Sequence, residues 1–366
     1  MTDRLNDAPS SAPFPAPGRE PADASGAPLA TVGLHHVSVL AADPGRNVAF
    51  WTRVMGQRLV KRTVNYDAPS MHHLYYGDGR GQVGTMLTFF PIPNAAAATH
   101  GTGETSTVGY AVRADALPAW RRRLEAEGVA VHEGERWDRP LLSFRDPDGL
   151  RVELAGHDAP PQVAGWADES LPEAMRLRGF DAVTLRLASA TATLQLLDAM
   201  GYGIVSERAE VSARRLRLET GSGTLGQAIE IVEEGRPLPG RDGRGTVHHV
   251  AFRLPDADAQ LRAREALTAL GLQVSDVRER DYFRSIYVRE PGGVLFEFAT
   301  DEPGATVDEP VSALGSALRL PAWAEAQRAR IEAALPPLNL PGDAADAGDP
   351  GDPGDAARTR DPEATR

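Results

Sequence analysis

One unit of secondary structure is repeated four times along this chain, and the repeat constrains its fold more than any other feature. Each unit begins with a short apolar strand, continues into an amphipathic helix that ends at a glycine, and closes with strands around a glycine-rich turn. The first strands are expected at residues 33–40, 108–112, 182–187 and 249–254. The order β-α-β-β-β therefore predicts four small curved sheets, each with one face covered by its own helix.

The predicted helices are bounded by residues that favour helix ends. Asp43 can cap the helix of the first unit, which we expect to end at Gly56. The other helices carry apolar residues on one face and are expected to end at Gly128, Gly201 and Gly271. Glycine-containing turns precede the closing strands at residues 77–79, 146–149, 221–223 and 290–293.

Each unit leaves one sheet face uncovered, so two units are expected to pair into a cup whose concave side takes a small ligand. The predicted fold class is α+β, with four βαβββ modules in two domains that have cup-shaped mixed sheets. The expected boundaries are 31–157 for a domain of modules one and two, and 176–302 for a domain of modules three and four.

The segments outside the repeats differ in composition. Residues 1–30 are rich in Ala, Pro, Asp and Ser, and residues 341–366 repeat Gly-Asp-Pro units, so both are predicted to be disordered tails. Residues 303–340 are expected to form a packing arm without chemistry, with one helix between Pro321 and Pro336.

Composition excludes several kinds of site and partner. The chain has no cysteine, so a metal would be held by histidine and carboxylate. A net charge of −12 argues against nucleic acid or an anionic membrane as a partner. No apolar run is long enough to span a membrane and no signal peptide is recognisable, so we expect a cytoplasmic protein. A homo-oligomer stays open.

The repeat architecture resembles the vicinal-oxygen-chelate superfamily, which includes glyoxalase I, antibiotic-resistance proteins and extradiol ring-cleaving dioxygenases. The resemblance covers about residues 33–300. It implies that the two domains are vicinal-oxygen-chelate domains, in which ligands for a metal come from the first and the last strand of each module.

Aligning the four units identifies candidate ligands. The first strands offer His36 and His249 in units one and four, but Gly109 and Ala182 in units two and three. The last strands offer, in chain order, Thr88, Glu153, Glu230 and Glu297. Pairing unit one with unit four collects two imidazoles and one carboxylate, with a threonine at the fourth corner. This is the facial triad of non-haem Fe(II) oxygenases.

The other cup, from units two and three, has no imidazole at these positions and is expected to lack a metal. Glu153 and Glu230 are then expected to lie at a rim or in salt bridges. Among the other histidines, His100, His132 and His157 are expected to be exposed to solvent. Whether the pair His72-His73 faces the cavity stays open.

Four further residues are candidates for the site beside the metal ligands. His35 and His248 each precede a ligand on its strand, so their side chains lie behind it. Tyr287 is on the strand expected to pair with that of Glu297, which would place its phenol near the metal. Arg280 could supply positive charge to an anionic substrate.

Several segments are similar to ring-cleaving dioxygenases of the hydroquinone 1,2-dioxygenase type. They are residues 33–36, 54–67, 73–78, 84–91 and 287–297. The resemblance implies that His36, His249 and Glu297 bind the metal, and it assigns the surroundings of the substrate to His35, His248, Tyr287 and Arg280. The implied activity is extradiol-type cleavage of a dihydroxylated aromatic by O2, with Fe(II) or alternatively Mn(II).

Two other functions stay open. A glyoxalase-type isomerase or lyase shares the fold and a divalent metal, but its fourth corner usually carries Glu or Gln, and Thr88 is a poor substitute. A metal-free binding protein, as in drug resistance, has no need of the histidine pairs. The sequence also leaves open which diol is the substrate, para or ortho.

Overall fold

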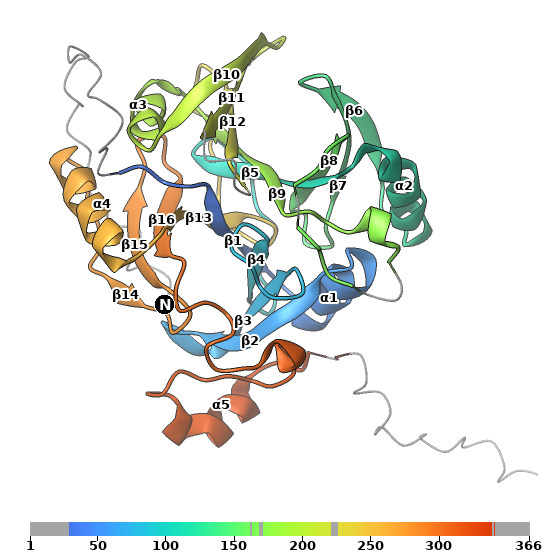
Figure 1. The fold of residues 1–366 in the computed structure, drawn as a ribbon, viewed down its shortest axis with the longest axis vertical. Coiled ribbons are helices and arrows are strands. Elements are labelled where there is room, and N and C mark those ends of the chain that lie inside the picture. Colours follow the sequence, from blue (N-terminus) through green and yellow to red (C-terminus); the bar gives the residue numbers. More distant parts are fainter. Residues whose placement is uncertain (1–28, 162, 168–170, 221–225, 339, 341–366) are drawn as a thin grey trace, which may run out of the picture.

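The computed structural model describes residues 29–161, 163–167, 171–220, 226–338 and 340, which form two curved sheets flanked by helices (Figure 1). Nearly all of both predicted tails and the predicted turn at 221–223 lie outside these residues. Leu29, at the edge of the N-terminal tail, is buried in the main core.

The first sheet joins the strands of modules one and four. In spatial order its strands are β14 (Arg278–Glu279), β15 (Arg284–Arg289), β16 (Leu295–Thr300), β13 (Val247–Leu254), β1 (Leu34–Ala41), β4 (Met86–Pro91), β3 (Ala68–Gly77) and β2 (Arg58–Asn65). The two modules meet through the antiparallel pair β1 and β13, whereas β4 and β16 lie parallel to the first strands of their own modules.

The second sheet joins modules two and three in the same way. Its order is β10 (Tyr202–Ala209), β11 (Arg214–Thr220), β12 (Ala228–Glu233), β9 (Phe180–Leu187), β5 (Glu104–Arg113), β8 (Arg151–His157), β7 (Arg139–Arg145) and β6 (His132–Arg136). The α+β class, the mixed sheets and the pairing of unit one with unit four are confirmed. Each sheet takes strands from both predicted segments, so the sheets do not decide the division into domains 31–157 and 176–302. That division stays a prediction.

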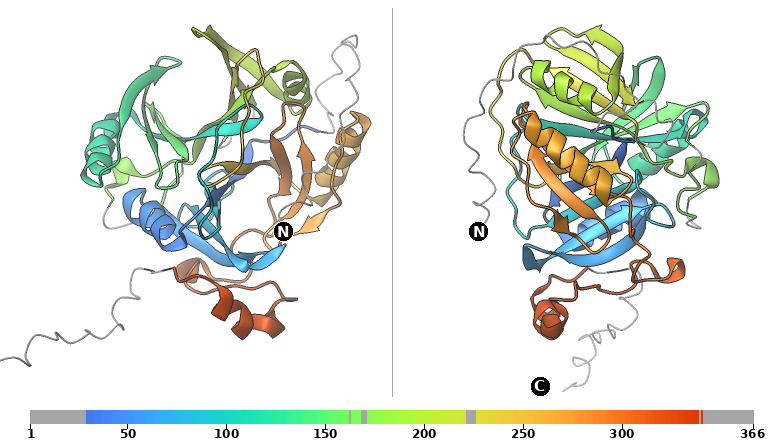
Figure 2. Two further views of the ribbon diagram at one scale, coloured as in Figure 1. Left: turned by 180° about the vertical axis from the view of Figure 1, so that it is seen from behind. Right: turned by 60° about the vertical axis from the view of Figure 1, so that its left-hand side comes forward.

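Helices lie on the outer sides of the sheets (Figures 1 and 2). Each module contributes one: α1 (Pro44–Ala49), α2 (Leu117–Ala126), α3 (Thr191–Ala199) and α4 (Ala257–Ala269). Asp43 caps α1 as expected, with Oδ1 accepting a hydrogen bond from Arg46 N at 2.7 Å. The predicted single helix up to Gly56 is wrong in its second half, because residues Phe50–Val54 form a π-helix and Met55 N donates to Phe50 O.

Alternation along the strands separates a helix-facing core from the concave face. On β1, Val37 and Val39 belong to the main hydrophobic core, together with Trp51 and Phe89. His36 and Ser38 point to the other face, where residues of β13, β16, β4 and β3 join them. Two modules thus bury their apolar side chains against helices and their polar side chains inside one cup.

The arm after the last strand packs against the outer strands of the first sheet, near β2 and β3 (Figure 1). Its helix is shorter than predicted: a 3₁₀ turn over Glu325–Gln327 leads into α5 (Arg328–Ala334). Ile331 is buried with Val64, whereas Trp323 is 53% exposed. Within the described residues, no helix is long and apolar enough to cross a membrane.

Candidate metal centre

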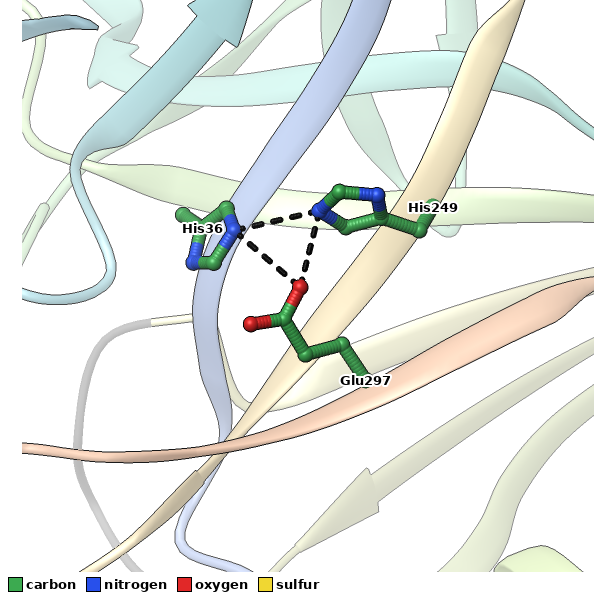
Figure 3. Close-up of side chains that lie close together, drawn as sticks. All are labelled: His36, His249 and Glu297. Carbon is green, nitrogen blue, oxygen red and sulfur yellow. Dashed lines mark hydrogen bonds and ion pairs between the residues drawn. The ribbon is translucent and has the colours of Figure 1, made fainter. Parts of the chain in front are cut away.

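Three side chains that could hold a metal ion converge on the concave face of the first sheet (Figure 3). His36 comes from β1, His249 from β13 and Glu297 from β16. Nε2 of His36 lies 3.3 Å from Nε2 of His249, and Oε2 of Glu297 lies 3.6 Å and 2.9 Å from these two nitrogens. All three side chains are buried.

The sheet register brings these residues together from distant parts of the sequence. Ser38 is opposite His249 across β1 and β13, and Ala251 is beside Glu297 across β13 and β16. Since residues two apart on a strand share a face, His36, His249 and Glu297 all point into the cup. The juxtaposition of the first and fourth modules is therefore what assembles the cluster.

Hydrogen bonding behind His36 fixes which of its nitrogens is free. His35 Nε2 lies 3.2 Å from the carbonyl oxygen of Thr300, which can only accept, so this nitrogen carries a hydrogen. Burial lowers the pKa of His35 to about 4, so the ring is neutral and its Nδ1 is an acceptor. His36 Nδ1 is 2.9 Å away and must donate to it. The Nε2 of His36 consequently presents a lone pair to the centre of the cluster.

His248 and His249 repeat this arrangement on β13. Their Nδ1 atoms are 2.8 Å apart, and burial lowers the pKa of His248 to about 3. A hydrogen bond from the ligand's Nδ1 to a neighbouring acceptor is the usual way in which a metal-binding histidine is oriented. In both pairs, the second histidine points toward the cluster and the first contacts its Nδ1.

Glu297 completes a donor set that fits a divalent cation. The Ser285 hydroxyl bonds to Oε1, whereas buried Oε2 accepts no well-aligned hydrogen bond from the described residues. Burial would raise the pKa of Glu297, but His36, His249 and the Ser285 hydroxyl hold it below its ordinary value. An ionised carboxylate and two imidazole nitrogens facing one point are the donors that Fe(II), Mn(II) or Zn(II) take.

Tyr287 and Arg280 lie at one side of the cluster. Tyr287 is directly opposite Glu297 in the register of β15 and β16, and its ring centroid is 5.8 Å from that of His249. Arg280 precedes β15, with its guanidinium carbon 5.8 Å from the centre of the Tyr287 ring. The structure therefore brings both predicted residues to the cup, where they supply a phenol and a fixed positive charge.

Thr88 lies at the fourth corner of the cluster, but its hydroxyl is hydrogen-bonded to two other side chains. It is 2.7 Å from Ser38 Oγ and 2.9 Å from His73 Nε2. His73 therefore faces the cup, whereas its neighbour His72 points outward and lies 2.8 Å from the carbonyl oxygen of Pro336. The sequence left open whether this pair faces the cavity. In the structure His73 does and His72 does not.

Phe283 is a residue of the site that the sequence did not single out. Its ring centroid is 5.0 Å from those of both His35 and His36, so it packs against the pair from the side of the loop before β15. It lies three residues after Arg280, which the sequence singled out for its charge. The fold shows that the side chain of Phe283 turns inward.

The second cup differs in chemistry, as the missing histidines indicated. Arg136 lies 2.5 Å from Glu153 and 3.2 Å from Glu230, which are thus salt-bridge residues as expected. The prediction that His157 is exposed to solvent is wrong. This residue ends β8 half-buried, and its Nε2 is 2.9 Å from Asp181.

Comparison with known proteins identifies the family of this chain. The sequence model of the Glyoxalase/Bleomycin resistance protein/Dioxygenase superfamily matches residues 33–154 and 219–298 of this chain. MhqA of Bacillus subtilis (strain 168), provisionally named a ring-cleaving dioxygenase, is 38% identical over 84% of this chain and 98% of its own. The chlorohydroquinone/hydroquinone 1,2-dioxygenase of Sphingobium indicum is 35% identical over 79% of this chain and 91% of its own.

A crystal structure with the same fold comes from Bacillus subtilis subsp. subtilis str. 168. That protein, provisionally named a dioxygenase, has a TM-score of 0.78 and 35% identity, over 84% of this chain and 97% of its own. The match extends over both sheets rather than one module. The chain therefore belongs to the Glyoxalase/Bleomycin resistance protein/Dioxygenase superfamily.

Proposed function

We propose that this protein is a metal-dependent ring-cleaving dioxygenase that inserts both atoms of O2 into a dihydroxylated aromatic, with cleavage of the extradiol type. The observation that carries the proposal is the buried cluster of His36, His249 and Glu297. Three protein ligands on one side of a metal leave coordination positions open for a diol oxygen and for O2. The names of the relatives at 35–38% identity support the same reaction class.

The metal in this proposal is Fe(II), with Mn(II) as the alternative. When bound, it supplies the one-electron chemistry that allows O2 to react with an electron-rich ring. The protein's part is to hold it: His35 and His248 orient the two imidazoles, and Ser285 orients the carboxylate. Phe283 keeps water away from the buried pair on β1.

The remaining side chains act on the substrate. Arg280 attracts the diol once it has lost a proton, and its charge also favours an ionised oxygen near Tyr287. Tyr287 Oη can donate a hydrogen bond to an oxygen on the ring, since burial raises the pKa of Tyr287 and keeps it protonated. His248 is neutral, and because its Nδ1 accepts the hydrogen bond from His249, its Nε2 carries the hydrogen and can donate a hydrogen bond to an oxygen of the substrate.

The isomerase alternative is less well supported. It calls for a fourth protein ligand, and the Thr88 hydroxyl is already hydrogen-bonded to Ser38 and His73. In a metal-free binding protein, the three converging acceptor atoms would be buried next to one another without a donor between them. Such an arrangement is unfavourable because buried polar atoms normally have hydrogen-bond partners.

The proposal is tested by anaerobic reconstitution with Fe(II) or Mn(II), followed by oxygen-electrode assays with hydroquinone, chlorohydroquinones and catechols. We expect oxygen uptake with at least one diol, and loss of both bound metal and uptake in His36→Ala and His249→Ala. His132→Ala is the matched control, because this histidine is exposed on β6 of the other sheet. Metal content and oxygen uptake that survive both substitutions would refute the proposal.

A further inference from the structure

Side chains join the two outermost strands of the first sheet, β2 and β14, which lie at opposite ends of its strand order. Tyr66, in the turn after β2, directs Oη to two acceptors in the segment after β14. These are Asp281 Oδ2 at 2.7 Å and the carbonyl oxygen of Arg280 at 3.1 Å. Asp67 Oδ2 lies 3.4 Å from Arg280 Nη2. No role proposed above uses Tyr66, Asp67 or Asp281.

The side chain of Arg280 lies between two aromatic rings. Its guanidinium carbon is 5.6 Å from the centre of the Tyr66 ring and 5.8 Å from that of the Tyr287 ring. A guanidinium is attracted to aromatic faces, so the two rings restrict a long side chain that has many rotamers. Tyr287 is opposite Glu297 in the register of β15 and β16. The charge of Arg280 is therefore held at the side of the cup that carries the metal cluster.

The backbone of Asp281 has a conformation that its surroundings must support. Its φ is 59°, in the left-handed region that non-glycine residues rarely adopt. Two backbone hydrogen bonds close the turn, from Arg280 N to Phe283 O at 3.0 Å and from Tyr282 N to Arg280 O at 2.7 Å. Burial raises the pKa of Tyr66, so its hydroxyl keeps the hydrogen that it donates to the Asp281 carboxylate. This bond stabilises the turn from which Arg280 and Phe283 reach the cup.

We propose that Tyr66 positions Arg280 to bind an ionised ring oxygen, and thereby sets how strongly the cup prefers anionic phenols over neutral ones. The proposal rests on the dioxygenase function above, in which Arg280 attracts a diol that has lost a proton. Tyr66 acts through Arg280 rather than by touching the ligand. Its hydrogen bonds to the Asp281 side chain and the Arg280 carbonyl fix where the guanidinium charge lies.

Equilibrium binding of two ring ligands tests this without turnover. Pentafluorophenol is ionised at neutral pH and phenol is neutral. Binding of both is measured by anaerobic calorimetry, with Fe(II)-loaded and with metal-free protein. We expect Arg280→Met to weaken pentafluorophenol binding about tenfold or more, the size of a hydrogen bond between charged groups. Tyr66→Phe should weaken it about threefold to tenfold and leave the Kd of phenol within about twofold.

A double-mutant cycle determines whether Tyr66 acts through Arg280. In the Arg280→Met protein, Tyr66→Phe should change neither Kd by more than about twofold, because the effects of coupled residues are not additive. Asp281→Ala should weaken pentafluorophenol binding as Tyr66→Phe does. Asp281→Asn should recover most of this loss, because it keeps an acceptor for Tyr66 Oη and tolerates the same backbone. Tyr76→Phe is the control, since its hydroxyl bonds to Asn47 in the core, and it should leave both Kd values unchanged.

Several results would overturn the assignment of Tyr66. They are unchanged pentafluorophenol binding in Tyr66→Phe, an equal loss for both ligands, the same effect of Tyr66→Phe with and without Arg280, and a wild type that binds neither phenol. Failure of the proposed function gives a different result. In that case no diol supports oxygen uptake, while binding of the two phenols still reports on Tyr66 and Arg280.

Discussion

A backbone carbonyl determines the tautomer of His36, which is one of the three proposed metal ligands. Thr300 O can only accept a hydrogen bond, and this fixes the tautomer of His35 and then that of His36. A buried imidazole therefore reaches the metal site already deprotonated at Nε2, so that less rearrangement is needed when a cation binds.

Substitution of His35 by Phe removes this control while keeping a ring against Phe283. We expect the affinity for Fe(II) or Mn(II) to fall about tenfold to hundredfold, the usual cost of losing the group that orients a ligand. Metal titration by calorimetry measures the effect, and His132→Phe is the control at an exposed position. Unchanged affinity in His35→Phe would mean that the Nδ1 contact does not orient His36.

Buried neutral histidines also predict a pH dependence of stability. His35 has a pKa of about 4 in the folded protein and His248 about 3, against an ordinary value of 6.5. Between pH 6.5 and 4 the unfolded chain therefore binds more protons than the folded one, so the free energy of unfolding falls as the pH falls through this range. Urea unfolding of metal-free protein should show this slope, and it should be smaller in His35→Gln but not in His132→Gln.

At this scale the sequence predicted which three side chains converge but not the full lining of the cup. His36, His249 and Glu297 occupy equivalent positions in repeated units, and the alternation of strand residues set their faces. His73 could not be separated from His72, because a pair of adjacent histidines on one strand always has one member on each face. Phe283 lies in a loop, where no periodicity shows which side chains point inward.

Among the secondary structure elements, the hairpin of β6 and β7 shows how the second cup is closed. Its turn residues Trp137 and Asp138 have φ of 53° and 58°, which non-glycine residues rarely adopt. Trp137 Nε1 lies 2.8 Å from Glu230, so the turn folds its indole inward next to Arg136. A guanidinium here lies between Glu153 and Glu230, which correspond in the repeat to Thr88 and Glu297.

Removing that guanidinium should cost far more than removing one on the surface. Arg136→Met leaves Glu153 and Glu230 with fewer charged partners in a mostly buried site, and we expect a loss of about 3 kcal/mol in the free energy of unfolding. Arg121→Met, whose side chain is 46% exposed and pairs with Glu125 and Glu133, should cost about 0.5 kcal/mol. Urea unfolding measures both, and equal losses would contradict the assignment of a buried ionic centre.

For the first helix, the sequence predicted the start but not the type of helix in its second half. Asp43 and Pro44 marked the start of the first helix correctly, because capping depends on local chemistry. The change to a π-helix at Phe50 was not predictable, since a wider turn over five residues leaves the apolar pattern of Trp51, Val54 and Met55 nearly unchanged. The packing of these side chains in the core decides between the two.

For the molecule as a whole, the arm closes one edge of the first cup through a buried cation. Lys61 on β2 is 1% exposed, and its Nζ lies 2.6 Å from Asp308 and 2.5 Å from Glu309. It also lies 4.7 Å from the centre of the Tyr282 ring, and Tyr282 Oη bonds to Asp308. The arm thereby holds the loop that carries Phe283 to the metal cluster.

A chain that ends at residue 302 should accordingly be less stable than the full chain, because Lys61 would stay inside the cup without an anion. The double variant Asp308→Asn, Glu309→Gln reproduces this at a smaller scale, and we expect a loss of about 3 kcal/mol in its free energy of unfolding. Adding Lys61→Met should restore much of that loss. A triple variant no more stable than the double one would show that Lys61 is not the source of the effect.

The joining of the first module to the last has a consequence for synthesis on the ribosome. Modules two and three are neighbours in the chain and can complete their sheet early. Strand β1 can pair with β13, and β13 with β16, only after module four has been synthesised. His36 leaves the ribosome long before Glu297, and in the interval the open edge of β1 has no partner strand. The growing chain therefore exposes this strand edge to aggregation while its middle can already be folded, and the three side chains of the cluster come together only after Glu297 has been synthesised.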